Sequence, residues 1–301
     1  MNRTTKGIAF ALATALISGV AIFVNSYAVK EITDAAVFTT LKNGIAALAL
    51  LGVAVLATRG RRELPVGART WSGMTLVGIF GGGVAFLLFF SGLAMASAPS
   101  AAFIHKTLFV WVAMLAVPFL GERLGLIQIG ALAALLGSQL LITPPSGVTW
   151  GMGETLIAAA TLIWAVEVVL AKRLLARVDP LVLGVGRLGI GLIVLIGYVG
   201  VTGKLGTLLA LDATQWVWVV GTGALLAGYV GTWFAALRFA PASVVTSVLV
   251  LGAPITATLA SIANGTLPQA QPLAGYVLAL LAAGTVAFVA TRRPKAQALL
   301  A

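Results

Sequence analysis

Residues 34–52 read DAAVFTTLKNGIAALALLG, and residues 179–197 read DPLVLGVGRLGIGLIVLIG. Both stretches begin with aspartate, and both place a Gly-Ile pair two residues after a basic residue, which is Lys42 in the first and Arg187 in the second. Each is apolar and long enough to cross a bilayer, whose hydrocarbon core takes about 20 residues of helix. A recurrence at this separation indicates two similar structural units. We place them at 1–145 and 146–301.

The composition is that of a polytopic membrane protein. Of 301 residues, 60% are hydrophobic and only 9% are charged, whereas a soluble protein carries roughly 25% charged residues. So few charges cannot cover a soluble surface. The chain has no cysteine and one histidine, which excludes disulfides and the usual zinc sites. We therefore expect neither a metal nor another cofactor.

The apolar runs, separated by charged or Pro/Gly-marked breaks, predict ten transmembrane helices. The first run is longer than the apolar region of a signal peptide and lacks a convincing cleavage site, so we interpret it as a helix. The ten runs cover residues 7–28, 35–57, 71–92, 98–119, 125–142, 150–170, 181–201, 214–235, 241–263 and 271–290.

The distribution of lysine and arginine predicts the orientation in the membrane. With the amino terminus in the cytoplasm, the inner segments hold most of the basic residues, and the outer loops hold only Lys30 and Lys204. Cytoplasmic loops carry such an excess of positive charge. We therefore attribute the net charge of +11 to basic residues in the cytoplasmic segments. We expect the protein to contact a lipid bilayer and no nucleic acid. Both termini are predicted to be cytoplasmic.

The repeat extends over most of the chain and gives each half five helices. Because five is odd, the second half enters the membrane from the opposite side. The predicted fold is an all-α membrane protein with ten transmembrane helices in two inverted-topology five-helix repeats. Substrate sites in such folds lie near the midplane between the halves. Matches outside the opening stretch include Trp71, Gly78 and Phe89, which recur as Trp216, Gly223 and Phe234.

Ionisable residues inside membrane helices are costly, so each is a candidate for function. Glu154 lies close to a helix start and is expected at the outer interface. The repeat-equivalent pair Lys42 and Arg187 is assigned a structural or gating role, with side chains that could snorkel to opposite surfaces or pair with a carboxylate or with helix carbonyls. Pro118 and Pro254 could kink the fourth and ninth helices and act in gating.

Three further ionisable residues occur in one half only, which favours substrate recognition over a structural role. His105 and Lys106 lie in the fourth helix, and the ninth helix has only apolar or small residues at the matching places. Glu167 in the sixth helix corresponds to Ala21 in the first. Glu167 could also pair with a neighbouring base, and His105 could be a packing histidine. The bases nearest to Glu167 are Lys172 and Arg173.

Aromatic residues gather on the segments expected to face the midplane, although many membrane aromatics serve packing or the interfacial belt. Together with the basic groups, they would suit a zwitterionic or anionic organic solute with an apolar part. The candidate substrate-binding aromatics are Phe86, Phe90, Phe109, Trp111, Trp164, Tyr229 and Trp233, and Phe89 lies among them.

Motifs for enzymatic chemistry are not supported. A Gly-x-Gly-x-x-Gly match at 184–189 lies inside a predicted membrane helix with no preceding strand, unlike a dinucleotide site. Nothing in the spacing places a nucleophilic serine beside His105, and no aspartate pair is spaced to hold magnesium. We expect a protein that is not an enzyme.

The ten-helix inverted repeat resembles the drug/metabolite transporter superfamily with EamA-type repeats. The resemblance is carried by Trp164, by the Lys42/Arg187 pair, and by small-residue turns before the fourth and ninth helices at 96–101 and 240–243. The sequence Gly121-Glu122-Arg123-Leu124 also looks like that family's signature, from which the second copy, residues 264–267, departs.

Within that superfamily, the chain most resembles the bacterial exporters of aromatic and other amino acids, in which Trp164 and Trp111 match cavity aromatics. The resemblance implies an inner-membrane secondary transporter that exports amino acids by alternating access. Facilitated diffusion and proton coupling through His105 or Glu167 both stay open. The alternatives are a carrier of drugs or nucleotide sugars and, less favoured, a membrane enzyme or scramblase.

Overall fold

The computed structural model describes residues 2–32, 34–58, 65–143, 150–267 and 269–292, and these residues form helices and loops without a β-strand. The predicted boundary between residues 145 and 146 lies outside this part of the chain. The helices are α1 (Arg3–Glu31), α2 (Ala35–Thr58), α3 (Ala68–Leu76), η1 (Val77–Val84), α4 (Ala85–Met95), α5 (Ala98–Lys106), α6 (Leu108–Leu120), α7 (Leu126–Ile142), α8 (Met152–Leu174), α9 (Pro180–Val201), η3 (Leu205–Leu209), α10 (Ala213–Phe239), α11 (Ala242–Leu249), α12 (Gly252–Ala263) and α13 (Ala270–Arg292).

Each of the ten predicted apolar runs is helical. In the described part of the chain, nine helical segments are long and apolar enough to cross a membrane, and three of them join shorter elements end to end: α3–η1–α4, α5–α6 and α11–α12. The tenth run, α7, is an apolar helix of 17 residues, which rises about 26 Å and is at the short limit for a span. The chain is thus a multi-pass membrane protein, and the full count of ten spans stays a prediction.

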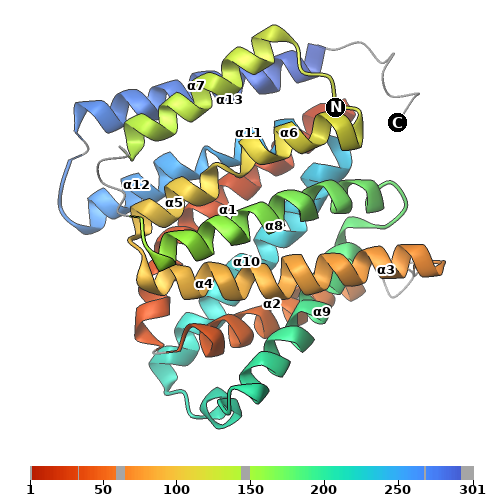
Figure 1. Ribbon diagram of the computed structural model, residues 1–301, viewed down its shortest axis with the longest axis vertical. Helices are drawn as coiled ribbons and strands as arrows, with labels where there is room; N and C mark the ends of the chain where they lie inside the picture. Colours follow the sequence, from red (N-terminus) through yellow and green to blue (C-terminus); the bar gives the residue numbers. More distant parts are fainter. Residues whose placement is uncertain (1, 33, 59–64, 144–149, 268, 293–301) are drawn as a thin grey trace.

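The packing of the helices is reciprocal between the two halves (Figure 1). Helix α1 runs along α10, and its repeat counterpart α8 runs along α4. Helix α2 packs against α10, as its counterpart α9 packs against η1. Two pairs of repeat-equivalent helices also contact each other, α2 with α9 and α7 with α13. The main apolar core lies among α1, α2, α4, α5, α6, α8, α9, α10 and α11, and α7 and α13 form a separate layer at one edge.

The repeated aspartates cap the helices that open the two matching stretches. Asp34 Oδ1 accepts hydrogen bonds from the backbone N–H groups of Ala36 and Val37 at 2.8 and 3.1 Å. Asp179 Oδ1 accepts one from Leu181 at 2.8 Å. A side-chain oxygen before the first turn satisfies N–H groups that have no partner within the helix. The conserved spacing of aspartate and helix in the repeat thus has a local physical cause.

Two spans are interrupted at matching places. The fourth breaks at Thr107, between α5 and α6, and the ninth breaks at 250–251, between α11 and α12. Pro254 stands four residues after Val250, where a proline removes the hydrogen bond to that carbonyl and crowds it. Pro118 lies inside α6, which continues to Leu120.

Helix η1 is a π-helical segment within the third span, and its glycines allow an unusually close crossing with α9. A Cβ atom on Gly82 would stand 2.1 Å from the carbonyl oxygen of Arg187, and one on Gly191 would stand 2.4 Å from Gly82. Small residues let membrane helices approach to backbone contact. This crossing brings the first half of α9 against the third span.

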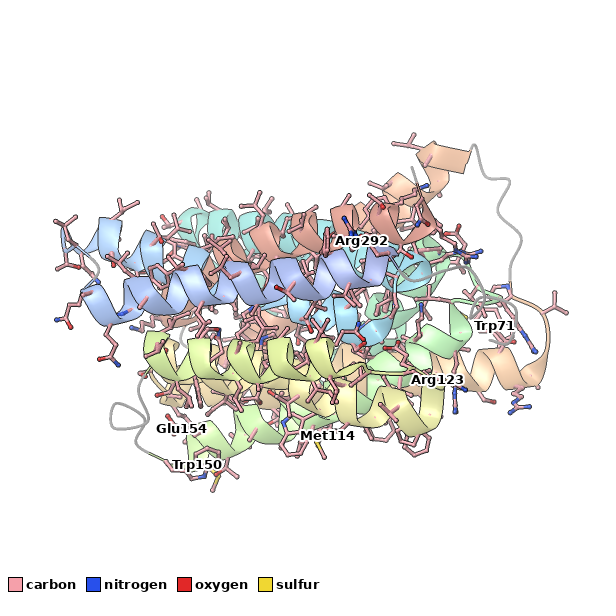
Figure 2. All side chains as sticks on the ribbon, turned by 90° about the horizontal axis from the view of Figure 1, so that it is seen from above. Trp71, Met114, Arg123, Trp150, Glu154 and Arg292 are labelled. Atoms are coloured by element: carbon pink, nitrogen blue, oxygen red, sulfur yellow. The ribbon has the colours of Figure 1, made fainter. Side chains whose placement is uncertain are left out.

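Polar groups tie helices together at the end of the bundle that holds Trp71 and Arg123, opposite the end with Trp150 and Glu154 (Figure 2). Glu122 of the Gly-Glu-Arg-Leu sequence accepts hydrogen bonds from the backbone N–H groups of Ala242 and Ser243 and so caps α11. At the opposite end, Glu154 accepts a bond from the Gly151 N–H at 3.0 Å and caps its own helix.

Candidate functional site

A cavity lies between the two halves. It encloses about 810 Å³ free of protein atoms, the solvent at its mouth included. Its walls come from α1, α2, α4, α5, α6, α8, α9 and α10. The lining residues are Ser18, Ala21, Ile22, Asn25, Lys42, Phe86, Phe89, Phe90, Leu93, His105, Leu108, Trp164, Glu167, Val168, Arg187, Thr222, Leu226, Tyr229 and Trp233.

A buried ion pair forms one wall of the cavity. Arg187 of α9 donates from Nε to Glu167 Oε1 at 2.9 Å and from a terminal nitrogen to Glu167 Oε2 at 3.2 Å. The same terminal nitrogen donates to the Gly81 carbonyl at 3.0 Å. A planar guanidinium matches a carboxylate in this two-point geometry. The pairing of Glu167 with Lys172 or Arg173 considered from sequence is wrong, because these two side chains bind backbone carbonyls at the helix ends.

Trp164 is oriented by the same carbonyl. Its indole N–H donates to Gly81 O at 3.0 Å. Its ring lies 5.3–5.4 Å, centroid to centroid, from those of Phe86, Phe89 and His105. Gly81 lies within the π-helical segment, and such segments are frequent at functional sites because they alter the regular hydrogen bonding of a helix. A Cβ atom on Gly81 would collide with Glu167.

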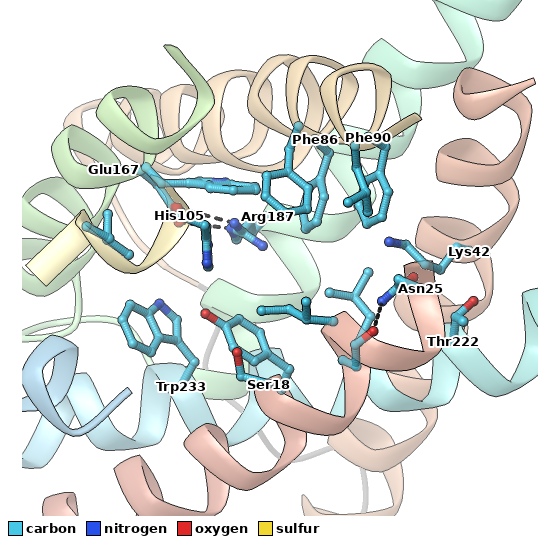
Figure 3. A pocket seen from close by; sticks show the side chains of 18 of the residues that line it. Ser18, Asn25, Lys42, Phe86, Phe90, His105, Glu167, Arg187, Thr222 and Trp233 are labelled. Carbon is cyan, nitrogen blue, oxygen red and sulfur yellow. Dashed lines mark hydrogen bonds and ion pairs between the residues drawn. The ribbon is translucent and has the colours of Figure 1, made fainter. Parts of the chain in front are cut away.

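Lys42 lies on the opposite side of the cavity from Glu167 (Figure 3). Its ammonium is 3.3 Å from the ring centroid of Phe90 and 5.1 and 5.5 Å from those of Phe38 and Phe86. Neither Lys42, 1% exposed, nor Arg187, 5% exposed, reaches the surface, so the predicted snorkelling is wrong. Within the described residues, the Lys42 ammonium forms no ion pair and no hydrogen bond, and it lies closest to the Phe90 ring among the three rings.

The remaining walls combine aromatic rings with small polar groups. Tyr229 and Trp233 of α10 stack at 5.9 Å. His105 Nδ1 is buried and has no hydrogen-bond partner among the described residues. Asn25, 8% exposed, donates from its amide nitrogen to the Ala21 carbonyl at 2.6 Å. Its amide oxygen is buried and finds no partner in the part of the chain that is described.

Several residues considered from sequence lie outside the cavity. Trp111 is 39% exposed, and its indole donates to Thr107 on its own helix. Phe109 is buried in a separate cluster with Leu135. Lys106 donates to the Ser18 hydroxyl at 3.1 Å and to the Leu249 carbonyl at 3.4 Å. The prolines at 118 and 254 do not line the cavity either.

The small polar residues Ser18, Asn25 and Thr222 line the cavity but were not singled out from sequence. Serine, threonine and asparagine are common in membrane helices as packing and hydrogen-bonding residues, so residue type alone does not distinguish these three from others. The repeat offers one clue, because Ser18 is the counterpart of Trp164.

A model of the EamA-like transporter family matches residues 5–143 and again residues 151–288. The chain belongs to the EamA-like transporter family. It is therefore a membrane transporter built from two EamA repeats, which supports the superfamily resemblance seen in the sequence. The family is one of transporters rather than enzymes, in agreement with the expectation drawn from the missing catalytic motifs.

A solved crystal structure of a protein superimposes on this chain with a TM-score of 0.70. The two chains are 17% identical, and the match covers 94% of this chain and 98% of the other. At this identity the likeness shows a shared fold over the matched part of the chain and no more. The search of curated proteins found no significant match.

Proposed function

We propose that this EamA-family transporter exports amino acids, aromatic ones among them, across the inner membrane of a bacterium. The observation that carries the proposal is the composition of the cavity. The lining has two basic side chains, Lys42 and Arg187, and one acidic side chain, Glu167, which gives it a formal excess of one positive charge. Apolar pockets with a few placed polar groups bind small organic molecules. The excess charge suits the carboxylate of such a solute.

The aromatic wall suits an apolar side chain. Phe86, Phe89 and Trp164 make edge and tilted ring contacts in one group, and Tyr229 and Trp233 stack in another. Aromatic rings pair favourably with further rings at centroid separations of 4.5–7 Å. A phenyl or indole group of a solute would complete such a set. A nucleotide sugar, in contrast, would need more basic groups than this lining provides.

We further propose that the two five-helix repeats have inverted topology, with both termini in the cytoplasm. The reciprocal packing of α1 on α10 and of α8 on α4 supports a two-fold relation between the halves. Alternating access then consists of rocking one repeat against the other around the cavity. The interruptions at Thr107 and at 250–251 would be places where the fourth and ninth spans bend.

Export by living cells tests this function. Bacteria that express the protein are loaded with a phenylalanine-containing dipeptide, and the phenylalanine that appears in the medium is measured over time. Cells with the wild-type protein should release it faster than cells without it. Trp164→Ala should abolish the difference, because this ring lies at the cavity. Trp111→Ala is the matched control at the surface and should retain it.

Equal release by cells with and without the protein, at verified expression in the membrane, would contradict the proposal. Equal loss of activity in both tryptophan variants would show that the effect does not arise in the cavity.

A further inference from the structure

The two halves differ in how their buried basic residue is paired with a counter-charge. In the second half, Arg187 on α9 finds its counter-charge in Glu167 on α8, at 2.9 Å. The counterparts in the first half are Lys42 on α2 and Ala21 on α1. Both of these line the cavity, but alanine brings only a methyl group. The first half has the cation without its carboxylate.

The ammonium of Lys42, without a counter-charge in the cavity, indicates a binding site for an anion. Lys42 is buried, and its described contacts are the faces of Phe38, Phe86 and Phe90. Ring faces attract a cation but supply no counter-charge. A charge removed from water is costly unless it is paired, and an ionisable residue inside a membrane protein marks a functional site whose partner has to be named. Within the described residues no such partner is present.

Asn25 supplies a second, independent indication of a ligand. It lies on α1 one turn after Ala21, and Figure 3 draws it on the same side of the cavity as Lys42. Its amide nitrogen is engaged with the Ala21 carbonyl, which fixes the amide orientation and leaves the oxygen as a buried acceptor without a partner in the described structure. A buried acceptor without a donor is unfavourable, so an N–H donor of a ligand would satisfy it.

We propose that Lys42 binds the carboxylate of the transported solute. This carboxylate pairs with Lys42 as the carboxylate of Glu167 pairs with Arg187 in the other half. The neighbouring Asn25 oxygen accepts a hydrogen bond from the α-ammonium group of the same molecule. The pair of groups thus recognises the backbone of a free amino acid, and the aromatic wall receives its side chain. This inference rests on the proposed function and specifies how the cavity selects its solute.

Equilibrium binding to the purified full-length protein in detergent tests the inference. The probes are L-phenylalanine, L-phenylalaninamide, 3-phenylpropionate and phenethylamine, which share a phenyl group and differ in carboxylate and amine. Phenylalanine should bind best, 3-phenylpropionate next, and the two compounds without a carboxylate weakest. Lys42→Gln should weaken binding of both carboxylates by about tenfold or more. It should leave the amide and the amine nearly unchanged.

Two further variants sharpen the test. Lys106→Gln removes a buried cation outside the cavity and should preserve the preference for carboxylates. Ala21→Glu supplies an internal carboxylate at the place symmetric to Glu167 and should abolish carboxylate binding. Its neutral control Ala21→Gln has nearly the same size and should bind carboxylates more tightly than Ala21→Glu. If thermal unfolding shows that Ala21→Glu does not fold, the binding measurements on Lys42→Gln and Lys106→Gln still test the inference.

The outcomes separate the inference from the proposed function. Equal affinity of wild type for phenylalanine and phenylalaninamide, or full carboxylate binding by Lys42→Gln, would overturn the role of Lys42 and leave an amino-acid carrier. If the protein binds 3-phenylpropionate but not phenylalanine, the result would support the role of Lys42 and overturn the proposed solute. Binding of none of the four compounds would overturn both.

Discussion

Arg187 and Glu167 hold each other through two hydrogen bonds, of 2.9 and 3.2 Å, in the wall of the central cavity. They come from consecutive helices of the second repeat, and the Gly81 carbonyl of the first repeat completes the arrangement. The pair therefore joins the two halves at the site where a solute would bind. Its integrity should matter for both stability and transport.

Breaking one side of this pair should be more harmful than removing both. Glu167→Gln leaves Arg187 buried without its carboxylate, and we expect a loss of about 3–5 kcal/mol in the free energy of unfolding. The double variant Glu167→Met/Arg187→Met removes both charges and should be more stable than Glu167→Gln. Thermal unfolding of the three purified proteins measures this order. A single variant as stable as the wild type would contradict the described geometry.

Gly82 should tolerate no larger residue, because α9 touches the third span there. Gly82→Ala would bring a methyl group to 2.1 Å from the Arg187 carbonyl oxygen, so we expect a loss of about 3 kcal/mol in stability. The control is Gly130→Ala in α7, where an added Cβ atom meets nothing within 4 Å. That change should be neutral or slightly stabilising, by up to about 1 kcal/mol. Comparable unfolding temperatures for both variants would refute the close crossing.

Glu122 should stabilise the start of α11. Its carboxylate accepts hydrogen bonds from the Ala242 and Ser243 N–H groups and from the Ser243 hydroxyl. An amide has only one oxygen and no charge, so we expect Glu122→Gln to lower stability by about 1–2 kcal/mol. Glu31→Gln serves as the control, because the side chain of Glu31 forms no hydrogen bond within the described structure. Equal unfolding temperatures of the two variants would exclude this capping role.

The loop between α1 and α2 should make stability depend on acid. Burial raises the pKa of Asp34, but hydrogen bonds from Lys204, Val37 and Ala36 outweigh it and hold the pKa below its usual 3.8. A carboxylate with a lowered pKa stabilises the fold above its ordinary pKa, and this contribution disappears as the pH falls through the lowered value. Asp34→Asn should thus be less stable than the wild type at neutral pH, by about 0.5–1 kcal/mol.

The difference between the two proteins should shrink when the pH is lowered below about 4. Unfolding temperatures of both proteins across the acid range measure this. A constant difference at every pH would show that Asp34 does not act through its charge. Lys204, whose pKa is raised by its hydrogen bond with Asp34, is the partner to exchange for glutamine in a double-mutant cycle.

The sequence predicted the helices well because the bilayer acts directly on composition. A span needs a long apolar run, and all ten runs are helical in the structure. The internal breaks were harder to predict. The fourth span is interrupted at Thr107 without a proline nearby, and the π-helical segment arises where Gly82 meets α9. The crossing of Gly82 with α9 is a contact between distant segments, which no local pattern contains.

The sequence predicted which types of residue form the candidate site, but not which of the candidates line the cavity or how they pair. His105 and Lys106 are adjacent on one helix, so their side chains point about 100° apart, and only His105 lines the cavity. Helix α5, which carries both residues, packs on α8, whereas α6, which carries the exposed Trp111, packs on α8 and α11. Glu167 found its partner on the next helix rather than in its own sequence neighbourhood. Such pairings follow from tertiary structure alone.

The central claim is that amino acids pass through this protein, and uptake by proteoliposomes tests it most directly. Vesicles containing only the purified chain are given labelled tryptophan, phenylalanine, threonine and lysine, with and without an imposed pH gradient. We predict saturable uptake of at least the aromatic amino acids, lost in Trp164→Ala and retained in Trp111→Ala. Uptake no greater than that of protein-free vesicles for every amino acid, by a protein that unfolds cooperatively on heating, would contradict the account.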